Sequence, residues 1–99
     1  MIALKPAGAG VPARDLLFVT TPALWPAWPF LPVVRRTSGT QELGVLFDAL
    51  GVCGRPGFAT AVFRTNLFAL PRTLPAFLAL PREAHDTAEA LLAGGWRVD

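Results

Sequence analysis

The sequence predicts a small α+β domain built on an antiparallel sheet, and three observations support this fold class. Two β-prone segments flank the turn dipeptide Ser38-Gly39, an arrangement typical of a β-hairpin. Helix-forming residues follow Asp86 and end at the glycine pair 94–95. The chain has 99 residues, of which 53% are hydrophobic, which suits one compact core. We therefore expect two to four strands, a Pro/Trp-rich extended segment and one C-terminal helix.

The chain divides into an arm and a domain. Residues 1–14 contain several glycines and prolines and predict an irregular N-terminal arm. Residues 15–99 are expected to form a single compact domain. At its start, residues 15–21 combine aliphatic, aromatic and β-branched side chains before Pro22. This composition predicts a short strand or an extended docked segment.

The most unusual stretch is Leu24–Val34, which contains Trp25 and Trp28 and a proline at every third or fourth position. Proline disfavours the α region in the residue before it, so an extended or polyproline II path is expected. The uncharged run 16–34 approaches the length of a membrane span. Its prolines argue against a spanning helix, because the carbonyls they free would find no hydrogen-bond donor in lipid.

A two-residue turn at Ser38-Gly39 sets the register of the expected hairpin. The cross-strand pairs are Thr37 with Thr40, Arg36 with Gln41, Arg35 with Glu42, and Val34 with Leu43. The opposite charges of Arg35 and Glu42 favour this register. The alternative is a helix over 40–50, since Leu43, Leu46, Phe47 and Leu50 have helical spacing. Gly44 and the β-prone residues weaken that helix, so we prefer the hairpin.

Four further segments complete the expected fold. Residues 51–57 contain three glycines and one proline and predict a loop. Residues 58–70 predict a buried strand that ends at Pro71, and residues 73–80 predict a connector or helical turn. Asp86 and Glu89 have the spacing of a capping box for the C-terminal helix. Trp96 is then expected to fold back onto the domain.

Residues with catalytic or ligand-binding chemistry are few and do not form a set. Cys53 is the only cysteine and His85 the only histidine, and they lie far apart in the chain. A nucleophile needs a nearby base, and a zinc site needs three or four ligands. The glycine-rich loop lacks the lysine of a phosphate-binding motif. We therefore expect no enzyme, no cofactor and no metal site, with a small enzyme using Cys53 or His85 as an alternative.

Charge is unevenly distributed along the chain, although the net charge is only +2. The region Arg35–Arg82 contains six arginines and two acidic residues, whereas residues 83–99 contain four acidic residues and one arginine. An intramolecular match between the two regions is the simpler interpretation. A weak nucleic-acid-binding surface in Arg35–Arg82 is the alternative, although the modest net charge disfavours it.

Together these features predict a non-enzymatic domain that binds another protein or a second copy of itself. The predicted partner-binding residues are Trp25, Trp28, Phe30, Arg35 and Arg36, because tryptophan and arginine are enriched at interface hot spots. The same tryptophans would also suit the core of the domain, and the sequence leaves that choice open. A lone cysteine and the absence of a secretory pattern favour a cytoplasmic location.

Overall fold

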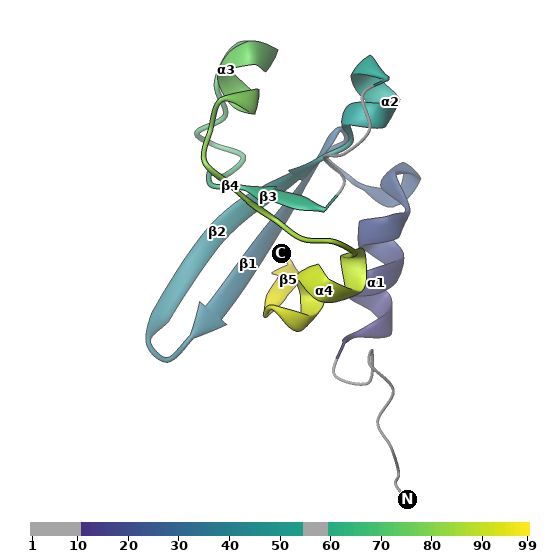
Figure 1. The fold of residues 1–99 in the computed structure, drawn as a ribbon, viewed down its shortest axis with the longest axis vertical. Helices are drawn as coiled ribbons and strands as arrows, with labels where there is room; N and C mark the ends of the chain where they lie inside the picture. Colours follow the sequence, from purple (N-terminus) through teal and green to yellow (C-terminus); the bar gives the residue numbers. More distant parts are fainter. Residues whose placement is uncertain (1–10, 55–59) are drawn as a thin grey trace, which may run out of the picture.

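The chain forms an α+β fold around one antiparallel sheet, as expected for this class. The computed structural model describes residues 11–54 and 60–99 (Figure 1). The strands are β1 (Phe30–Thr37), β2 (Thr40–Phe47), β3 (Ala61–Phe63), β4 (Arg82–Ala84) and β5 (Trp96–Val98). The helices are α1 (Ala13–Thr20), the 3-10 turn η1 (Pro22–Leu24), α2 (Ala49–Cys53), α3 (Leu74–Leu78) and α4 (Ala88–Ala93). The strand order is β4-β3-β2-β1-β5.

The number of elements differs from the expectation of two to four strands and one helix. The sheet has five strands, and the described residues include four α-helices. Apart from α1, which has eight residues, the additional elements are short, with three residues each in β4 and β5 and five each in α2 and α3. Elements of this length show little hydrophobic periodicity and are stabilised by tertiary contacts rather than by their own sequence.

The hairpin prediction is confirmed in detail. β1 and β2 pair antiparallel with Arg35 opposite Glu42 and Thr37 opposite Thr40, which is the predicted register. Gly39 has φ +72° in the connecting turn, a conformation that glycine adopts without strain. The alternative helix over 40–50 is wrong for residues 40–47, because pairing with β1 extends along the whole of β2.

The expected strand or extended docked segment at residues 15–21 is wrong, because residues 15–20 lie in α1. Val19 is buried, and Leu16 packs against the same hydrophobic cluster. The buried Asp15 carboxylate accepts a hydrogen bond from the backbone N–H of Val98 at 2.9 Å. Contacts with α4 and β5 therefore outweigh the local preference for a strand.

The Pro/Trp segment is a succession of turns rather than one extended run. The backbone N–H of Trp25 donates to the carbonyl of Pro22 at 3.0 Å, and that of Trp28 donates to Trp25 at 3.2 Å. Phe30 donates in the same way to Ala27 at 2.9 Å. The Pro22 carbonyl accepts such a bond, although proline has no N–H to donate. The chain therefore turns three times before β1.

The strand expected over 58–70 is limited to Ala61–Phe63. Residues 58–59 lie outside the described part of the chain. After β3 the side chain of Asn66 accepts a hydrogen bond from the backbone N–H of Phe68 at 2.9 Å. Asparagine favours this local turn over continued strand pairing, which explains why the strand is short.

The C-terminal helix is confirmed as α4, although its cap differs from the predicted one. Thr87 is the N-cap, and its hydroxyl accepts a hydrogen bond from Ala90 N–H at 3.0 Å. Gly94 ends the helix, and Gly95 has φ +100°.

The loop expected over 51–57 begins within α2, which ends at Cys53. Residues 55–57 lie outside the described residues.

Two hydrophobic clusters cover opposite faces of the sheet. On one face, α1 and α4 pack over side chains that include Leu31, Val33 and Trp96. On the other face, Phe77 of α3 packs on Phe47 and Phe63 and forms an aromatic cluster with them. Among the described residues, no helix is long and apolar enough to span a membrane.

Gly44 in β2 lies where these layers are tightest. A Cβ atom at this position would overlap Cγ1 of Val62 and lie 3.3 Å from Cζ3 of Trp96. We expect Gly44→Ala to lower the free energy of unfolding by about 1–3 kcal/mol through overpacking. Urea denaturation followed by far-UV circular dichroism measures the loss. Gln41→Ala, on an exposed part of the same strand, should change stability by less than about 0.5 kcal/mol, and equal losses would contradict the overpacking explanation.

Candidate functional site

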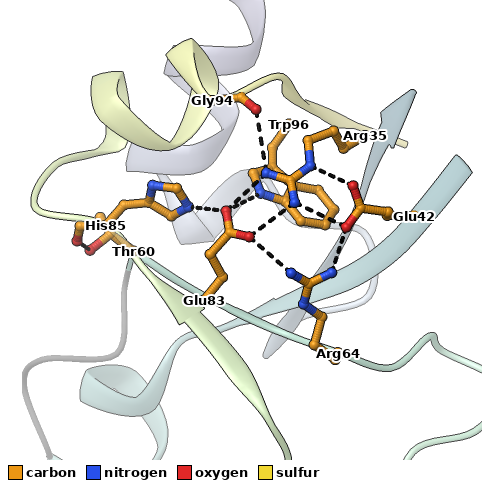
Figure 2. Close-up of polar contacts among 8 residues, drawn as sticks. All are labelled: Arg35, Glu42, Thr60, Arg64, Glu83, His85, Gly94 and Trp96. Carbon is orange, nitrogen blue, oxygen red and sulfur yellow. Dashed lines mark hydrogen bonds and ion pairs between the residues drawn. The ribbon is translucent and has the colours of Figure 1, made fainter. Parts of the chain in front are cut away.

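A cluster of charged and aromatic side chains lies on the sheet face that carries α1 and α4. We call it the charge network, and its members are Arg35, Glu42, Arg64, Glu83, His85 and Trp96 (Figure 2). The hairpin register places Arg35 directly opposite Glu42. On its other side Arg35 is opposite Trp96 of β5. Glu83 comes from β4 at the far edge of the sheet.

Trp96 connects the two edges of the sheet. Its backbone is in β5, yet its indole Nε1–H donates to Oε2 of Glu83 in β4 at 3.0 Å. The ring passes close to Gly44, where the missing side chain leaves room for it. Trp96 is completely buried, and the Arg35 guanidinium lies 4.5 Å from its ring centre. The network is therefore built on a cation–π contact as well as on ion pairs.

Glu83 accepts most of the hydrogen bonds in the network. Arg35 donates to both of its carboxylate oxygens, each at 3.0 Å. Arg64 donates to Oε1 at 3.0 Å, and His85 Nε2 lies 2.7 Å from Oε2. Glu42 binds the same two arginines, with Arg35 Nε at 2.8 Å and Arg64 Nη1 at 2.6 Å. Two carboxylates thus share two guanidinium groups.

These contacts hold both carboxylates in the ionised form. Hydrogen bonds from Arg35 and then from Arg64 lower the pKa of Glu42 to about 2. Burial raises the pKa of Glu83, but hydrogen bonds from Trp96, Arg35 and His85 outweigh burial and lower it to about 2. The same bonds to Glu42 and Glu83 raise the pKa of Arg35. Glu42 and Glu83 are therefore ionised, and Arg35 is protonated, throughout the neutral pH range.

Such a network suits structural cohesion better than acid–base chemistry. A general acid or base works best with a pKa near the operating pH, far from the values of Glu42 and Glu83. His85 is engaged by Glu83, and the backbone carbonyl of His85 accepts a hydrogen bond from the Thr60 hydroxyl. Over residues 11–54 and 60–99, no group of three or more potential metal ligands occurs.

A second candidate site is an apolar cleft between α2 and α3, which stand apart beyond one end of the sheet (Figure 1). The cleft has a volume of about 300 Å³. Phe30 and Phe77 line it together with Val52 of α2 and Leu74 of α3. We call this site the α2–α3 cleft. Its walls are mainly hydrophobic and aromatic, which is the usual composition of a binding pocket.

Two apolar side chains of α2, and the Trp28 side chain bound to the N-cap of α2, are exposed. Trp28 is 50% exposed, Leu50 65% and Val52 44%. The indole Nε1–H of Trp28 donates to Oδ2 of Asp48 at 2.9 Å. Asp48 also caps α2 by accepting a hydrogen bond from Gly51 N–H at 3.1 Å. Trp28 is therefore held in a defined position at the start of α2.

The five predicted partner-binding residues do not form one patch. Trp25 is buried under α1, where its indole donates to the carbonyl of Phe18 at 2.6 Å. Phe30 lines the α2–α3 cleft, and Trp28 is tied to α2. Arg35 belongs to the charge network, whereas Arg36 is exposed near the hairpin turn. Their role in partner binding stays a prediction.

Several site residues were not predicted from the sequence. The charge network includes Glu83 and Trp96, which are 48 and 61 positions after Arg35 in the chain and meet it only through the strand order. Two sequence signals bore on the network: the Arg35–Glu42 match in the hairpin, and the expected charge match between Arg35–Arg82 and residues 83–99, to which the ion pairs of Arg35 and Arg64 with Glu83 belong. Val52 lines the cleft and Leu50 lies on the same helix, and the sequence did not indicate that either is exposed, because exposed and buried aliphatic residues look alike in a short helix.

Comparisons of the chain with protein-family models, with curated proteins and with solved structures find no match.

Proposed function

We propose that this protein is a small, non-enzymatic interaction domain that binds another protein through Trp28, Leu50 and the α2–α3 cleft. The observation that carries the proposal is the exposed Trp28 ring, which Asp48 holds and which precedes Pro29 and Phe30, two residues that line the cleft. Tryptophan in a fixed position is a common binding anchor, because little side-chain freedom is lost when a partner covers it.

A positive charge at the α2–α3 cleft also favours a protein partner. Arg72 lines the cleft and is exposed. Within the described part of the chain, no ion pair forms at Arg72. An apolar partner segment that also carries a carboxylate would match both the cleft and this cation.

The nucleic-acid alternative receives less support. Two of the six arginines in the Arg35–Arg82 region, Arg35 and Arg64, are paired with Glu42 and Glu83. Their charge is therefore largely balanced within the protein, which weakens the field that a phosphate backbone would meet. The alternative that uses Cys53 or His85 as a catalytic group also receives less support, because the charge network in which His85 contacts Glu83 contains no hydroxyl or thiol side chain that the imidazole could activate.

Site-specific photo-crosslinking tests the proposal. A photoreactive residue replaces Leu50 in the full chain, which is expressed in its native cells and irradiated. We expect one discrete adduct with a different protein, identified by mass spectrometry, and its loss when Trp28→Ala is added. The matched control places the probe at Glu89, which is exposed on α4. The proposal is wrong if folded protein gives no adduct from position 50, or gives one that Trp28→Ala leaves unchanged.

A further inference from the structure

A cavity of about 270 Å³ lies where five separate segments of the chain meet. The segments are α1, the Pro/Trp segment, β1, the turn after β3 and the end of β5. They line the cavity with side chains that include Arg14, Phe18, Pro26, Leu31, Leu67 and Asp99. All of the lining side chains are apolar except for one cation, Arg14, and one carboxylate, Asp99.

Hydrogen bonds hold the backbone beside both charged residues. The Asp15 carboxylate accepts a hydrogen bond from Val98 N–H at 2.9 Å, so the residue after Arg14 is tied to the residue before Asp99. The N–H of Asp99 donates in turn to the Pro32 carbonyl at 3.0 Å. Contacts within the chain therefore bring Arg14 and Asp99 to the same cavity.

The two charges do not neutralise each other, although their backbones are close together. In the part of the chain that the structure describes, neither Arg14 nor Asp99 takes part in an ion pair. The Arg14 guanidinium lies instead 5.5 Å from the ring centre of Phe18. Both charged side chains are exposed. A ligand with a carboxylate and an ammonium group would complement both charges at once.

A wider groove adjoins the cavity. It has a volume of about 440 Å³, and Pro32, Leu67 and Asp99 line both the groove and the cavity. The turn that contains Leu67 is ordered, because the Asn66 side chain accepts a hydrogen bond from Phe68 N–H at 2.9 Å. The shared wall is therefore formed before a ligand binds, as is usual for small-molecule sites.

We propose that this cavity binds a free α-amino acid with a large apolar side chain. The carboxylate of the ligand pairs with Arg14, whose guanidinium presents the N–H groups that match it. The ammonium group pairs with Asp99, and the apolar side chain lies against the apolar walls. The cavity is slightly smaller than the pockets of drug-sized ligands, about 300–1,000 Å³, which favours a ligand as small as an amino acid.

Isothermal titration calorimetry of the full chain with L-phenylalanine tests the proposal. We expect one site per chain with a dissociation constant of about 1 mM or lower. Hydrocinnamate lacks the amino group and phenethylamine lacks the carboxylate. Each should bind at least about tenfold more weakly, because each leaves one charge of the cavity unpaired. Glycine should also bind at least about tenfold more weakly, because it has no side chain to bury.

Two variants assign the charges to their partners. Arg14→Gln should remove the preference for phenylalanine over phenethylamine, since the carboxylate then has no cation to pair with. Asp99→Lys should remove the preference for phenylalanine over hydrocinnamate, because the amino group then faces a cation. Both positions are exposed, so each variant should fold, and circular dichroism confirms it.

The α2–α3 cleft supplies controls that keep this proposal separate from the partner-binding function. Trp28→Ala and Arg72→Gln should leave the affinity for phenylalanine unchanged, and Arg14→Gln should leave the protein adduct at Leu50 unchanged. The proposal is overturned if the folded chain binds no phenylalanine at about 10 mM. It is also overturned if hydrocinnamate or phenethylamine binds as tightly as phenylalanine, or if the variants at Arg14 and Asp99 keep the full preference.

Discussion

Replacement of Trp96 by alanine should lower the free energy of unfolding by about 3–5 kcal/mol, the cost of removing a large buried aromatic side chain. Trp96 is fully buried in the cluster beneath α1 and α4. Its loss also leaves Glu83 without one hydrogen-bond donor and Arg35 without the ring it covers. Small domains have a stability of only about 5–15 kcal/mol, so the variant should be close to unfolding. Urea denaturation followed by circular dichroism measures the change.

Trp28→Ala is the matched control, because it removes the same side chain from a half-exposed position. It should cost less than about 1 kcal/mol, mainly for the hydrogen bond to Asp48. Similar losses at positions 96 and 28 would contradict the assignment of Trp96 to the core. Trp96→Phe should cost less than Trp96→Ala, because it keeps most of the buried ring area while it removes the donor to Glu83 and part of the indole.

Glu83→Gln should lower the free energy of unfolding at neutral pH by about 1–3 kcal/mol, the usual cost of losing hydrogen bonds to a charged group. The pKa of Glu83 is lowered from 4.5 to about 2 in the folded protein. Between these values the unfolded chain binds more protons than the folded one, so stability rises with pH. The contribution is complete above about pH 5 and is lost as the pH falls toward 2. The gap between wild type and variant should therefore close on acidification.

Urea denaturation at a series of pH values tests this dependence. Glu89→Gln is the control, because it removes the same charge from the exposed surface of α4. Its stability should stay close to that of the wild type across the series. If the gap between wild type and Glu83→Gln is constant from neutral pH to pH 3, the network does not stabilise the fold through the ionised carboxylate.

The charge network shows where sequence reasoning succeeded and where it stopped. The Arg35–Glu42 contact follows from a two-residue turn and a match of opposite charges, both of which are local. Glu83 and Trp96 reach the same place from opposite edges of the sheet. They meet because of the order of the five strands in the sheet. This order cannot be read from the residue pattern of any single strand.

The tryptophans show the same division. Their enrichment in the Pro/Trp segment was evident, but three residues of separation gave Trp25 and Trp28 opposite environments. Trp25 is 5% exposed and donates to the carbonyl of Phe18, whereas Trp28 is 50% exposed and binds Asp48. The repeated turns made by the prolines rotate successive side chains to different directions, so a shared segment did not imply a shared surface.

The sequence by itself determined the α+β class, the β1–β2 hairpin with its register, and the C-terminal helix up to Gly94. These depend on turn residues, charge pairing and helix propensity, which act over a few positions. Only the tertiary structure decided that residues 13–20 are helical, that β4 and β5 complete the sheet, and that Trp96 reaches Glu83 across Gly44. These features depend on contacts between distant segments, whose burial outweighs local preference.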